Sequence, residues 1–599
     1  QSYKNVSFLH STKGYSLFIN SFYRIRADIG RVSKGLRITT AGPKADIYVF
    51  TGSVLENMEE YTALTGKPLL PPAWVFEPWA GGGVGRWMDG PTHDVIQEME
   101  GVIRKFKNLD IPHSGLYAEG AGWKWEDHYN KEEIYKIAAF TKQQKMRVFS
   151  WQFSHLDMEQ AKELLPNCAE EDLPITRTPD YHGEKVLPCA IDFSHPRAEE
   201  LLENQWHDRM DAGFDGTMVD FGEIIPDEAV FYDGRTGDEM HNAYALDYTK
   251  AYRKLFEKYK GEDHVLFSRS AAAGVQKYSC QFGGDQLSSF RGLTYAMNGG
   301  LTLAASGFPF WGVDAGGYSG FADEETYLRW TEFAAFSPIM RFHGVTPREP
   351  WAYSRYAVSV YKFYAWLREN LLKYSVHTAE EAHKTGIPMM RPLPMVFPED
   401  KEAVYWEDEY FYGSDLLVAP VHQEGEKRRI YFPSGSWINL LDFRKMVGGN
   451  RIFQVDVPID KIPVYIREGA CILSVMNGEL QLGQSMTYEK KNTVLMSRAL
   501  NETSGKRYAD GKEIEYNILG KTGEDFFMLR HAFETEFIVL LGFDRKPESL
   551  ELNGVSLSEG ASLNALNYGS GWYWREDTAV IVSVPKLEKT EIHVIHKEQ

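Results

Sequence analysis

Between about residue 70 and residue 385 the chain alternates short apolar strands with amphipathic helices, and this alternation restricts the fold more than any other feature of the sequence. In Thr92–Leu109 the apolar side chains recur at helical spacing, and the next apolar run, Gly115–Glu119, is typical of a strand. The alternation continues with strands at Arg147–Trp151, Thr217–Asp220 and Val265–Ser268, and with helices over Leu201–Met210 and around Tyr244–Tyr259. Such a chain builds a parallel sheet covered by helices. We therefore predict an α/β fold whose centre is a (β/α)8 TIM barrel.

On both sides of this region the sequence predicts β-sheet domains. Residues 1–66 contain β-rich segments at Phe8–Ile19 and Asp46–Phe50 and are expected to form strands and turns. After residue 386 the helices stop and short strands return at turn-rich spacing, which is typical of antiparallel β-sandwiches. The expected domains are the remainder of an N-terminal sandwich at 1–66, the barrel at 67–385 with an inserted loop near 158–190, a proximal sandwich at 386–470 and a distal sandwich at 471–599.

The composition argues against several classes of protein. The net charge is −19 and no basic stripe is present, so no nucleic-acid partner is expected. The four cysteines form no CxxC pair, so neither a disulfide framework nor a zinc site is expected. No apolar run reaches 18 residues and no signal peptide is evident, so we expect no membrane span and a cytoplasmic location. The first residue is Gln rather than Met, which leaves room for a leader that has been removed, and homo-oligomerisation stays open.

Two aspartates that follow predicted strands are the candidates for catalysis. The apolar run of GFDGTMVDFGE ends at Asp220, and after the strand VLFS the pair Gly283 and Gly284 allows a sharp turn before Asp285. Reactive groups of barrel enzymes lie at the carboxyl ends of strands, and a pair of carboxylates is what hydrolysis of a glycosidic bond requires. The local sequence leaves a structural alternative for each, with Asp220 as a helix N-cap and Asp285 in an Asx-turn of a surface loop.

A second group of candidates can bind sugar hydroxyls. Trp311 and Asp314 precede a glycine pair at a predicted strand end, and Arg341 and His343 flank Phe342. Because alternate residues of an extended segment share a face, Arg341 and His343 are expected to point the same way. An aromatic ring together with Asp, Arg and His side chains is a common set for binding a sugar, although a lone histidine is more often structural.

Four runs of sequence carry a resemblance to a known family. In chain order they are DFGEIIPDEAVFYDGRTGDEMHN, VLFSRSAAAGVQKYSCQFGGD, SGFPFWGVDAGGY and SPIMRFHG. In order and spacing they resemble glycoside hydrolase family 31, particularly its bacterial α-xylosidases. The resemblance implies that Asp220 is the nucleophile and Asp285 the general acid/base of a retaining mechanism, with no cofactor and no catalytic metal. It also implies a pocket around the non-reducing-end sugar, formed by Arg269, Trp311, Asp314, Arg341 and His343. By the same comparison the chain begins partway through the N-terminal sandwich, which is expected to be truncated or reduced.

The chain departs from the family in places that help to select the sugar. Its nucleophile motif is DFGE, as in α-xylosidases and sulfoquinovosidases, rather than the DMNE-like motif of many α-glucosidases. The segment YAEGAGWKWED has no plain match to the aspartate that usually holds the glycone, and Glu119 is its nearest substitute. We expect one wall of the pocket to contain Glu119, Trp123, Lys124 and Trp125, unless this segment is a solvated loop whose tryptophans pack on a helix. Trp79 and Trp87, beside the GGG turn, are further candidates of the same kind.

The sequence therefore predicts a retaining exo-α-glycosidase that removes α-linked xylose or glucose from an oligosaccharide or a small α-glycoside. One alternative keeps this mechanism and changes the sugar to α-galactose or to an acidic sugar such as sulfoquinovose. Another is α-transglycosylation, in which a sugar hydroxyl replaces water in the second step. A non-catalytic carbohydrate-binding protein is the alternative of a different class; loss of a carboxylate would be its signature, and both carboxylates are present.

Overall fold

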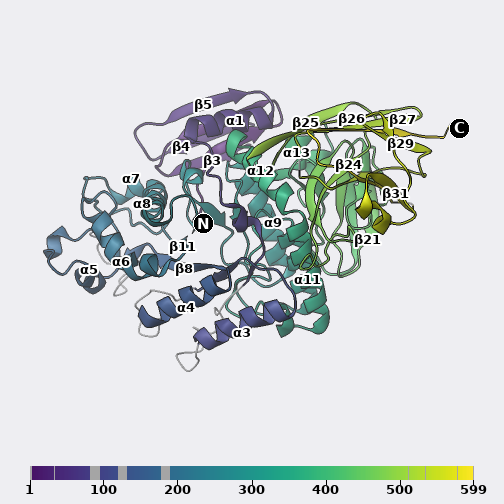
Figure 1. Ribbon diagram of the computed structural model, residues 1–599. Coiled ribbons are helices and arrows are strands. Elements are labelled where there is room, and N and C mark those ends of the chain that lie inside the picture. The colour runs from purple at the N-terminus through teal and green to yellow at the C-terminus, as the bar shows by residue number, and fades with distance from the viewer. Residues whose placement is uncertain are drawn as a thin grey trace.

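A parallel sheet lies at the centre of the computed structural model, which describes residues 3–32, 34–80, 95–118, 131–176, 189–509, 511–532, 534–576 and 578–597 (Figure 1). Seven strands pair in the order β14-β13-β12-β11-β8-β7-β6, and all six pairs are parallel. In chain order they are β6 (Trp79–Ala80), β7 (Gly115–Tyr117), β8 (Arg147–Phe153), β11 (Gly216–Asp220), β12 (Val265–Ser268), β13 (Cys280–Phe282) and β14 (Trp311–Gly312).

An eighth extended segment, Ile339–Phe342, closes this sheet into a barrel. The amide of Ile339 donates to the carbonyl oxygen of Trp311 in β14 (3.2 Å), and the amide of Trp79 in β6 donates to the carbonyl oxygen of Met340 (3.0 Å). Parallel bridges therefore join this segment to both edges of the sheet. The predicted (β/α)8 barrel is confirmed.

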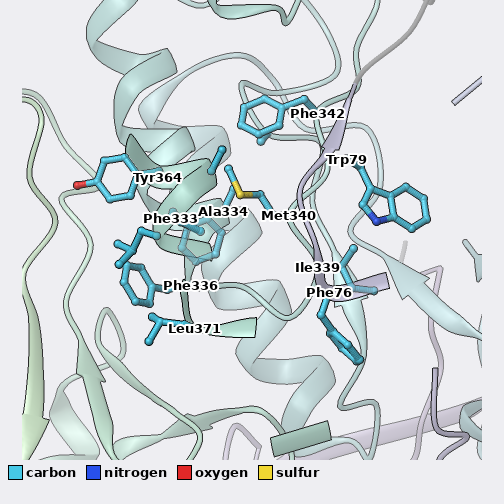
Figure 2. Packing of buried hydrophobic residues seen from close by; sticks show 14 of the residues in the cluster. Phe76, Trp79, Phe333, Ala334, Phe336, Ile339, Met340, Phe342, Tyr364 and Leu371 are labelled. Atoms are coloured by element: carbon cyan, nitrogen blue, oxygen red, sulfur yellow. The ribbon is translucent and has the colours of Figure 1, made fainter. Parts of the chain in front are cut away.

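A buried arginine holds the turn that leads into the eighth strand. Arg368 lies in α11 (Arg355–Asn370), and only 1% of its surface is exposed. Its guanidinium donates to the carbonyl oxygens of Phe76 (2.7 Å), Ala335 (3.1 Å) and Ser337 (2.7 Å) and to the hydroxyl of Tyr412 (3.0 Å). Figure 2 shows the apolar packing beside this turn, with Met340 directed toward Phe333 and Ala334 of α10 (Glu324–Ala335). Hydrogen bonds from Arg368 and apolar packing against α10 thus both hold the last strand of the barrel in place.

Helices alternate with the barrel strands, as the sequence predicts. Side-chain caps define where several of them begin; the hydroxyl of Ser289, for example, accepts from the amide of Gly292 (3.1 Å) at the start of α9. The helices of this region, besides α10 and α11, are α3 (Val95–Asn108), α4 (Lys131–Gln143), α6 (Ala198–Ala212), α7 (Gly237–Met240), α8 (Ala243–Lys260), α9 (Phe290–Ala305) and α12 (Leu372–Thr385).

The excursion between β8 and α6 is more regular than its polar sequence suggests. Strands β9 (His155–Leu156) and β10 (Cys189–Ala190) pair antiparallel, and the segment between them begins with α5 (Met158–Leu164). Asp157 starts this helix, because its carboxylate accepts from the amide of Gln160 (2.7 Å) in a capping box. Seven residues are too few for a helical period to stand out in a polar sequence.

The N-terminal part contains a helix that the sequence analysis did not predict. Strands β1 (Phe8–Ser11), β2 (Tyr15–Asn20) and β5 (Asp46–Thr51) form an antiparallel sheet, and β3 (Ile25–Ile29) pairs with β4 (Leu36–Thr40). The prediction of strands and turns up to residue 66 is wrong for Val54–Thr65, which forms α1. The missed signal was a capping box, in which the amide of Glu56 donates to the hydroxyl of Ser53 (3.3 Å) and the amide of Ser53 to the Glu56 carboxylate (2.8 Å).

Sheets predominate after residue 386, although the prediction that helices stop there is wrong for the short helix α13 (Leu393–Val396), and Figure 1 shows the sheets on the side of the barrel where α11 and α12 lie. The first sheet contains β15 (Met390–Pro392), β16 (Tyr410–Tyr412), β17 (Leu416–Val418), β22 (Val464–Arg467), β19 (Ser436–Asn439) and β20 (Lys445–Val447), and a separate pair is formed by β18 (Lys427–Phe432) and β21 (Arg451–Asp456). The second sheet contains β23 (Cys471–Met476), β24 (Lys491–Ser497), β28 (Phe537–Leu541), β32 (Ala579–Ser583) and β31 (Gly571–Arg575). The third contains β25 (Thr503–Ala509), β26 (Lys512–Lys521), β27 (Glu524–Arg530), β33 (Lys589–Ile595), β29 (Ser549–Leu552) and β30 (Val555–Ser556). All these pairs are antiparallel except β24 with β28, and the exact domain boundaries stay predictions.

Helix α9 packs closely on the barrel, and two neighbouring glycines in it provide a matched test. A Cβ atom on Gly300 would lie 1.8 Å from Cζ2 of Trp311, whereas a Cβ atom on Gly299 would meet nothing within 4 Å. We expect Gly300→Ala to lower the temperature of unfolding, at a cost of about 1–3 kcal/mol for overpacking. Gly299→Ala should raise it, because alanine favours a helix by roughly 1 kcal/mol over glycine. Thermal unfolding of both variants checks this, and equal midpoints would contradict the packing of α9 against Trp311.

Candidate active site

Asp220 is the last residue of β11 and is nearly buried, with 8% of its surface exposed. Each of its carboxylate oxygens has a donor. The indole N–H of Trp151 donates to Oδ2 (2.8 Å), and the amide of Phe221 donates to Oδ1 (2.9 Å). Nη1 of Arg269 lies 3.5 Å from Oδ1. The carboxylate is thus held in one orientation at the carboxyl end of a barrel strand. The residues that follow Asp220 do not form a helix, so Asp220 is not a helix N-cap.

The backbone turns sharply after Asp220. Phe221 has φ 58° and Gly222 has φ 89°, so two successive residues occupy the left-handed region, which is unusual for phenylalanine. A Cβ atom on Gly222 would lie 2.6 Å from the hydroxyl of Ser270, so only glycine fits there. This turn brings Glu223 back to Arg269, whose Nε donates to Oε1 of Glu223 (2.9 Å) while its guanidinium lies 3.9 Å from the centre of the Phe221 ring. Arg269 therefore forms ion pairs with both acidic residues of the DFGE motif, Asp220 and Glu223.

Burial and charge act in opposite directions on Asp220. Burial raises the pKa of its carboxyl to about 6, although Arg269 and the two hydrogen-bond donors favour the charged form. The charge of Asp285 also raises the pKa of Asp220, which means that the two carboxylates are near enough to interact. Asp220 is consequently ionised at neutral pH but loses its charge in mildly acidic solution.

Asp285 lies beyond β13, in a loop that is fastened to the loop after β14. The amides of Tyr318 and Ser319 donate to the carbonyl oxygen of Gln286 (2.8 and 3.0 Å). Arg348 joins the same two loops, since it donates to the hydroxyl of Ser288 (2.9 Å) and to the carbonyl oxygens of Gly317 (2.8 Å) and Gly320 (2.9 Å). Solvent reaches Asp285, in contrast to Asp220. The position suits a group that exchanges protons with a substrate and with water.

The surroundings of Asp285 favour its protonated form. Loss of hydration at the barrel mouth raises the pKa of this carboxyl, and the positive charges of Arg269 and Arg341 oppose that rise. Asp285 also interacts electrostatically with Asp314. The charge of Asp285 thus raises the pKa of both Asp220 and Asp314.

Asp314 and Arg341 form a buried ion pair beside the carboxylates, with about 1% of each residue exposed. Burial raises the pKa of Asp314 to about 7 in spite of this arginine, and burial with Arg341 and Arg348 lowers the pKa of His343 well below its usual value, so His343 is neutral. Three atoms of this group have no hydrogen-bond partner among the described residues, namely Oδ2 of Asp314, Nε of Arg341 and Nδ1 of His343. Buried polar atoms rarely stay without a partner, so this set is suited to hold a polar ligand.

The eighth strand presents Arg341 and His343 to the same side, as its alternation predicts. The His343 ring lies 4.6 Å from the ring of Tyr117 in β7, and the Arg341 guanidinium lies 5.7 Å from the same ring. Phe342 points the other way and packs against Tyr361 of α11 (4.7 Å). Strands β7 and β14 and the eighth strand thus contribute to one group of side chains.

Two predicted site residues have the contacts of core residues. Trp311 packs against Gly300 of α9 and near Phe333 of α10, and Trp79 stacks on Phe149 with the ring centres 4.2 Å apart. A role in the pocket stays a prediction for both. The other predicted residues of this kind, Glu119, Trp123, Lys124, Trp125 and Trp87, lie outside the described residues.

Several residues around Asp220 were missed by the sequence analysis. Glu223 had a signal, because it stands in the DFGE motif three residues after Asp220. Trp151 had a weaker one, as an aromatic residue near the carboxyl end of a predicted strand. Lys4, which also lies at this site, had none, since nothing in the sequence relates it to residues more than 200 positions away. Within the described residues no group of three or more His, Cys, Asp or Glu side chains is placed to hold a metal ion, and no helix is long and apolar enough to cross a membrane.

This arrangement combines a buried, oriented carboxylate with a second carboxylate that solvent reaches. Different environments let two carboxylates act in different protonation states, one as nucleophile and one as acid. The neighbouring ion pair and the neutral histidine offer both acceptors and donors to hydroxyl groups. The site is therefore equipped for substitution at a carbon that bears a polar leaving group.

Known proteins with similar chains fit this description. An isomaltosyltransferase of Sporosarcina globispora is 27% identical, over 96% of this chain and 58% of its own. An α-xylosidase of Emericella nidulans is 28% identical, over 78% of this chain and 62% of its own. The fold is that of the cycloalternan-forming enzyme from Listeria monocytogenes, with a TM-score of 0.87 at 22% identity over 99% of this chain and 62% of that one. The chain thus spans about three fifths of the length of these relatives.

Family models match most of the barrel and the sheet that follows it. Residues 68–378 match the TIM-barrel domain of glycosyl hydrolases family 31, and residues 386–472 match the family's C-terminal domain. The first match includes Asp220, Asp285, Asp314 and the eighth strand, and it covers more than half of the chain. The chain belongs to glycosyl hydrolase family 31.

Proposed function

We propose that this protein is a retaining exo-α-glycosidase in which Asp220 is the nucleophile and Asp285 the general acid/base. The observation that carries the proposal is the pairing of a buried, oriented carboxylate at the end of β11 with a carboxylate open to solvent in the loop after β13, on the same side of the barrel, where only β12 separates the two strands. A binding protein has no need to desolvate one carboxylate and keep a second beside it, because that arrangement raises the free energy of the charged state.

In the first step Asp220 attacks the anomeric carbon, and the bond from that carbon to the leaving oxygen breaks. Asp285, protonated in its partly desolvated position, gives its proton to that oxygen. A covalent glycosyl ester on Asp220 results. In the second step Asp285, now ionised, takes a proton from water, the water oxygen attacks the anomeric carbon, and Asp220 leaves as a carboxylate. Two inversions give net retention.

The group around Asp314 supports the assignment of the sugar site. Its unpartnered atoms include an acceptor, Oδ2 of Asp314, and a donor, Nε of Arg341, and a sugar hydroxyl satisfies both kinds. Asp220 and Asp314 both follow strands of the same barrel, at β11 and β14, so in this proposal a sugar with its anomeric carbon at Asp220 has its other hydroxyls toward the ion pair. This favours recognition of a terminal sugar over cleavage within a chain.

The relatives favour an α-glucosidic oligosaccharide as the substrate. Similarity extends over 96% of the chain with a protein named for isomaltosyl transfer and over 78% with one named for α-xyloside cleavage. The former name also supports transglycosylation as a second candidate, in which a sugar hydroxyl attacks the ester on Asp220 in place of water. Product analysis at high substrate concentration separates the two, since only transfer gives products longer than the substrate.

Replacement of the nucleophile tests the proposal directly. Asp220→Ala should lower kcat on an aryl α-glucoside by at least roughly 10³-fold, because no other group can form the ester. The matched control is Asp227→Ala, in the same loop but half exposed and paired only with Arg24 on the surface, which should retain activity within about twofold. Activity in Asp220→Ala close to that of the control would reject Asp220 as nucleophile.

The general acid can be identified from how the rate of cleavage depends on the leaving group. Asp285→Asn should slow cleavage of an unactivated disaccharide by roughly 10²–10⁴-fold and affect an activated nitrophenyl glycoside far less in the first step, because a good leaving group departs without a proton. Values of kcat/KM on the two substrates give the ratio, because kcat/KM reports the first step and is not affected by the loss of the base in the second. Equal losses on both would remove Asp285 from this role.

The acidic limb of the pH profile reports on Asp220. Since the pKa of Asp220 is about 6 and the nucleophile must be ionised, kcat/KM should fall as the pH falls through about 6. Trp151→Phe removes a donor that favours the charged form, so the pKa rises and the limb moves to higher pH by about one unit. Trp406→Phe, which removes an exposed hydrogen bond to Glu402, should leave the profile unchanged. A limb that stays in place in Trp151→Phe belongs to another group.

A further inference from the structure

The first residues of the described chain, Tyr3–Asn5, lie beside the residues that follow β12 (Val265–Ser268). Lys4 forms a parallel bridge with Ala271, two residues beyond Arg269. The amide of Asn5 donates to the carbonyl oxygen of Ala271 (2.9 Å). The amide of Ala271 in turn donates to the carbonyl oxygen of Tyr3 (3.2 Å). The segment Tyr3–Asn5 therefore extends the backbone pairing of the barrel mouth.

This segment places two side chains against the catalytic group. The ammonium of Lys4 donates to the carbonyl oxygen of Arg269 and lies 5.6 Å from the centre of the Phe282 ring in β13. The ring of Tyr3 lies 4.5 Å below the Arg269 guanidinium. The same ring is so close to Gly284 that a Cβ atom there would be 3.1 Å from it. Arg269 is consequently held between the Phe221 ring and the Tyr3 ring, with Lys4 fixing its backbone.

The balance of charge explains why a second cation is useful at this point. Asp220 and Glu223 carry two negative charges, and Arg269 is in contact with both. Oε2 of Glu223 is buried and has no hydrogen-bond partner among the described residues. A single arginine does not neutralise the two carboxylates of buried Asp220 and partly buried Glu223, and unbalanced charge of one sign would shift the protonation of the nucleophile.

We propose that Lys4 is a positioning residue of the active site, which anchors Arg269 and supplies the second positive charge that keeps Asp220 ionised. This inference rests on the proposed function of Asp220 as nucleophile. It makes the segment Tyr3–Asn5 part of the catalytic machinery, although the rest of the N-terminal sheet lies away from the carboxylates. Lys4 acts through Arg269 and by its field, without contact with the substrate.

The titration of Lys4 agrees with this role. Burial lowers the pKa of Lys4 to about 7, an effect that Glu223 and Asp220 oppose and Arg269 reinforces. The charged groups that face Lys4 are thus Asp220 and Glu223 from the β11 loop and Arg269 from the β12 loop, with Asp285 of the β13 loop behind Arg269. At pH 6, where Asp220 titrates, Lys4 is mostly an ammonium, and its charge lowers the pKa of Asp220.

The test compares Lys4→Met, Lys4→Arg and the control Lys13→Met, which removes an exposed lysine from the turn between β1 and β2. The measurement is kcat/KM for an aryl α-glucoside as a function of pH. Lys4→Met should move the acidic limb upward by about half a pH unit and lower kcat at least tenfold with little change in KM. Lys4→Arg should restore the position of the limb, and Lys13→Met should match the wild type. A wild-type limb in Lys4→Met would overturn the proposal, because a merely structural lysine changes activity without moving the limb.

A second measurement needs no turnover and separates this inference from the proposed function. The folded-state pKa of Lys4 is below the usual lysine value of 10.5, so the charged form is disfavoured on folding, and the stability of the wild type relative to Lys4→Met should rise as pH increases from 7 to 10.5. Urea unfolding midpoints of both proteins give this difference. A difference independent of pH would show that Lys4 is not in the site. If the wild type cleaves no α-glycoside while the difference varies with pH, the placement of Lys4 holds and the function assigned to Asp220 fails.

Discussion

Closure of the parallel sheet by the segment Ile339–Phe342 is the constraint on which the site depends. Without pairing to both β14 and β6, the residues of this segment would have no fixed position relative to Asp220, which lies on the far side of the barrel. Arg368 fixes the entry to this strand by donating to carbonyl oxygens that belong to no regular ladder. A buried guanidinium is tolerated there because these acceptors satisfy it. The same arginine reaches Tyr412, so the first C-terminal sheet is tied to the strand that carries Arg341 and His343.

Within the closed barrel, the pKa of each carboxylate follows from the balance between its burial and the cations near it. Asp220 shares Arg269 with Glu223, and Asp314 has Arg341 to itself but lies deeper. In both cases burial outweighs the attraction, and the pKa of each is above its ordinary value. Asp285 differs by being open to solvent in a loop that Arg348 and the backbone of Tyr318 hold in place. One acid is thus fixed by hydrogen bonds to its own oxygens and the other by the fastening of its loop.

Strands β7, β8, β11 and β12 and helices α3, α6 and α8 could be predicted because their apolar patterns extend over enough residues to be recognised. Asp220 could be found because it directly ends such a strand, and the shared face of Arg341 and His343 because alternation in an extended segment is geometric. The helix Val54–Thr65 was missed because only one stripe of it is buried and its capping signal is short. The contact of Trp311 with Gly300 of α9 could not be predicted, because it depends on how the helix packs on the barrel, and the role of Trp311 in the pocket stays a prediction. The pairing of Lys4 with Ala271 joins residues that no local pattern connects.

The unsatisfied atoms of Asp314, Arg341 and His343 have a consequence for selectivity. A ligand that lacks a hydroxyl at this place leaves a buried donor or acceptor without water and without a partner, and each such atom costs about 1–3 kcal/mol. A site built to hydrogen-bond a hydroxyl rejects the analogue that lacks it by roughly 10⁴–10⁵-fold, whereas an extra or missing methylene changes discrimination by only roughly 10–200-fold. Analogues that lack a hydroxyl should therefore bind much more weakly than bulkier analogues. The selectivity of this pocket depends more on the positions of the oxygen atoms on the sugar ring than on the size of the sugar.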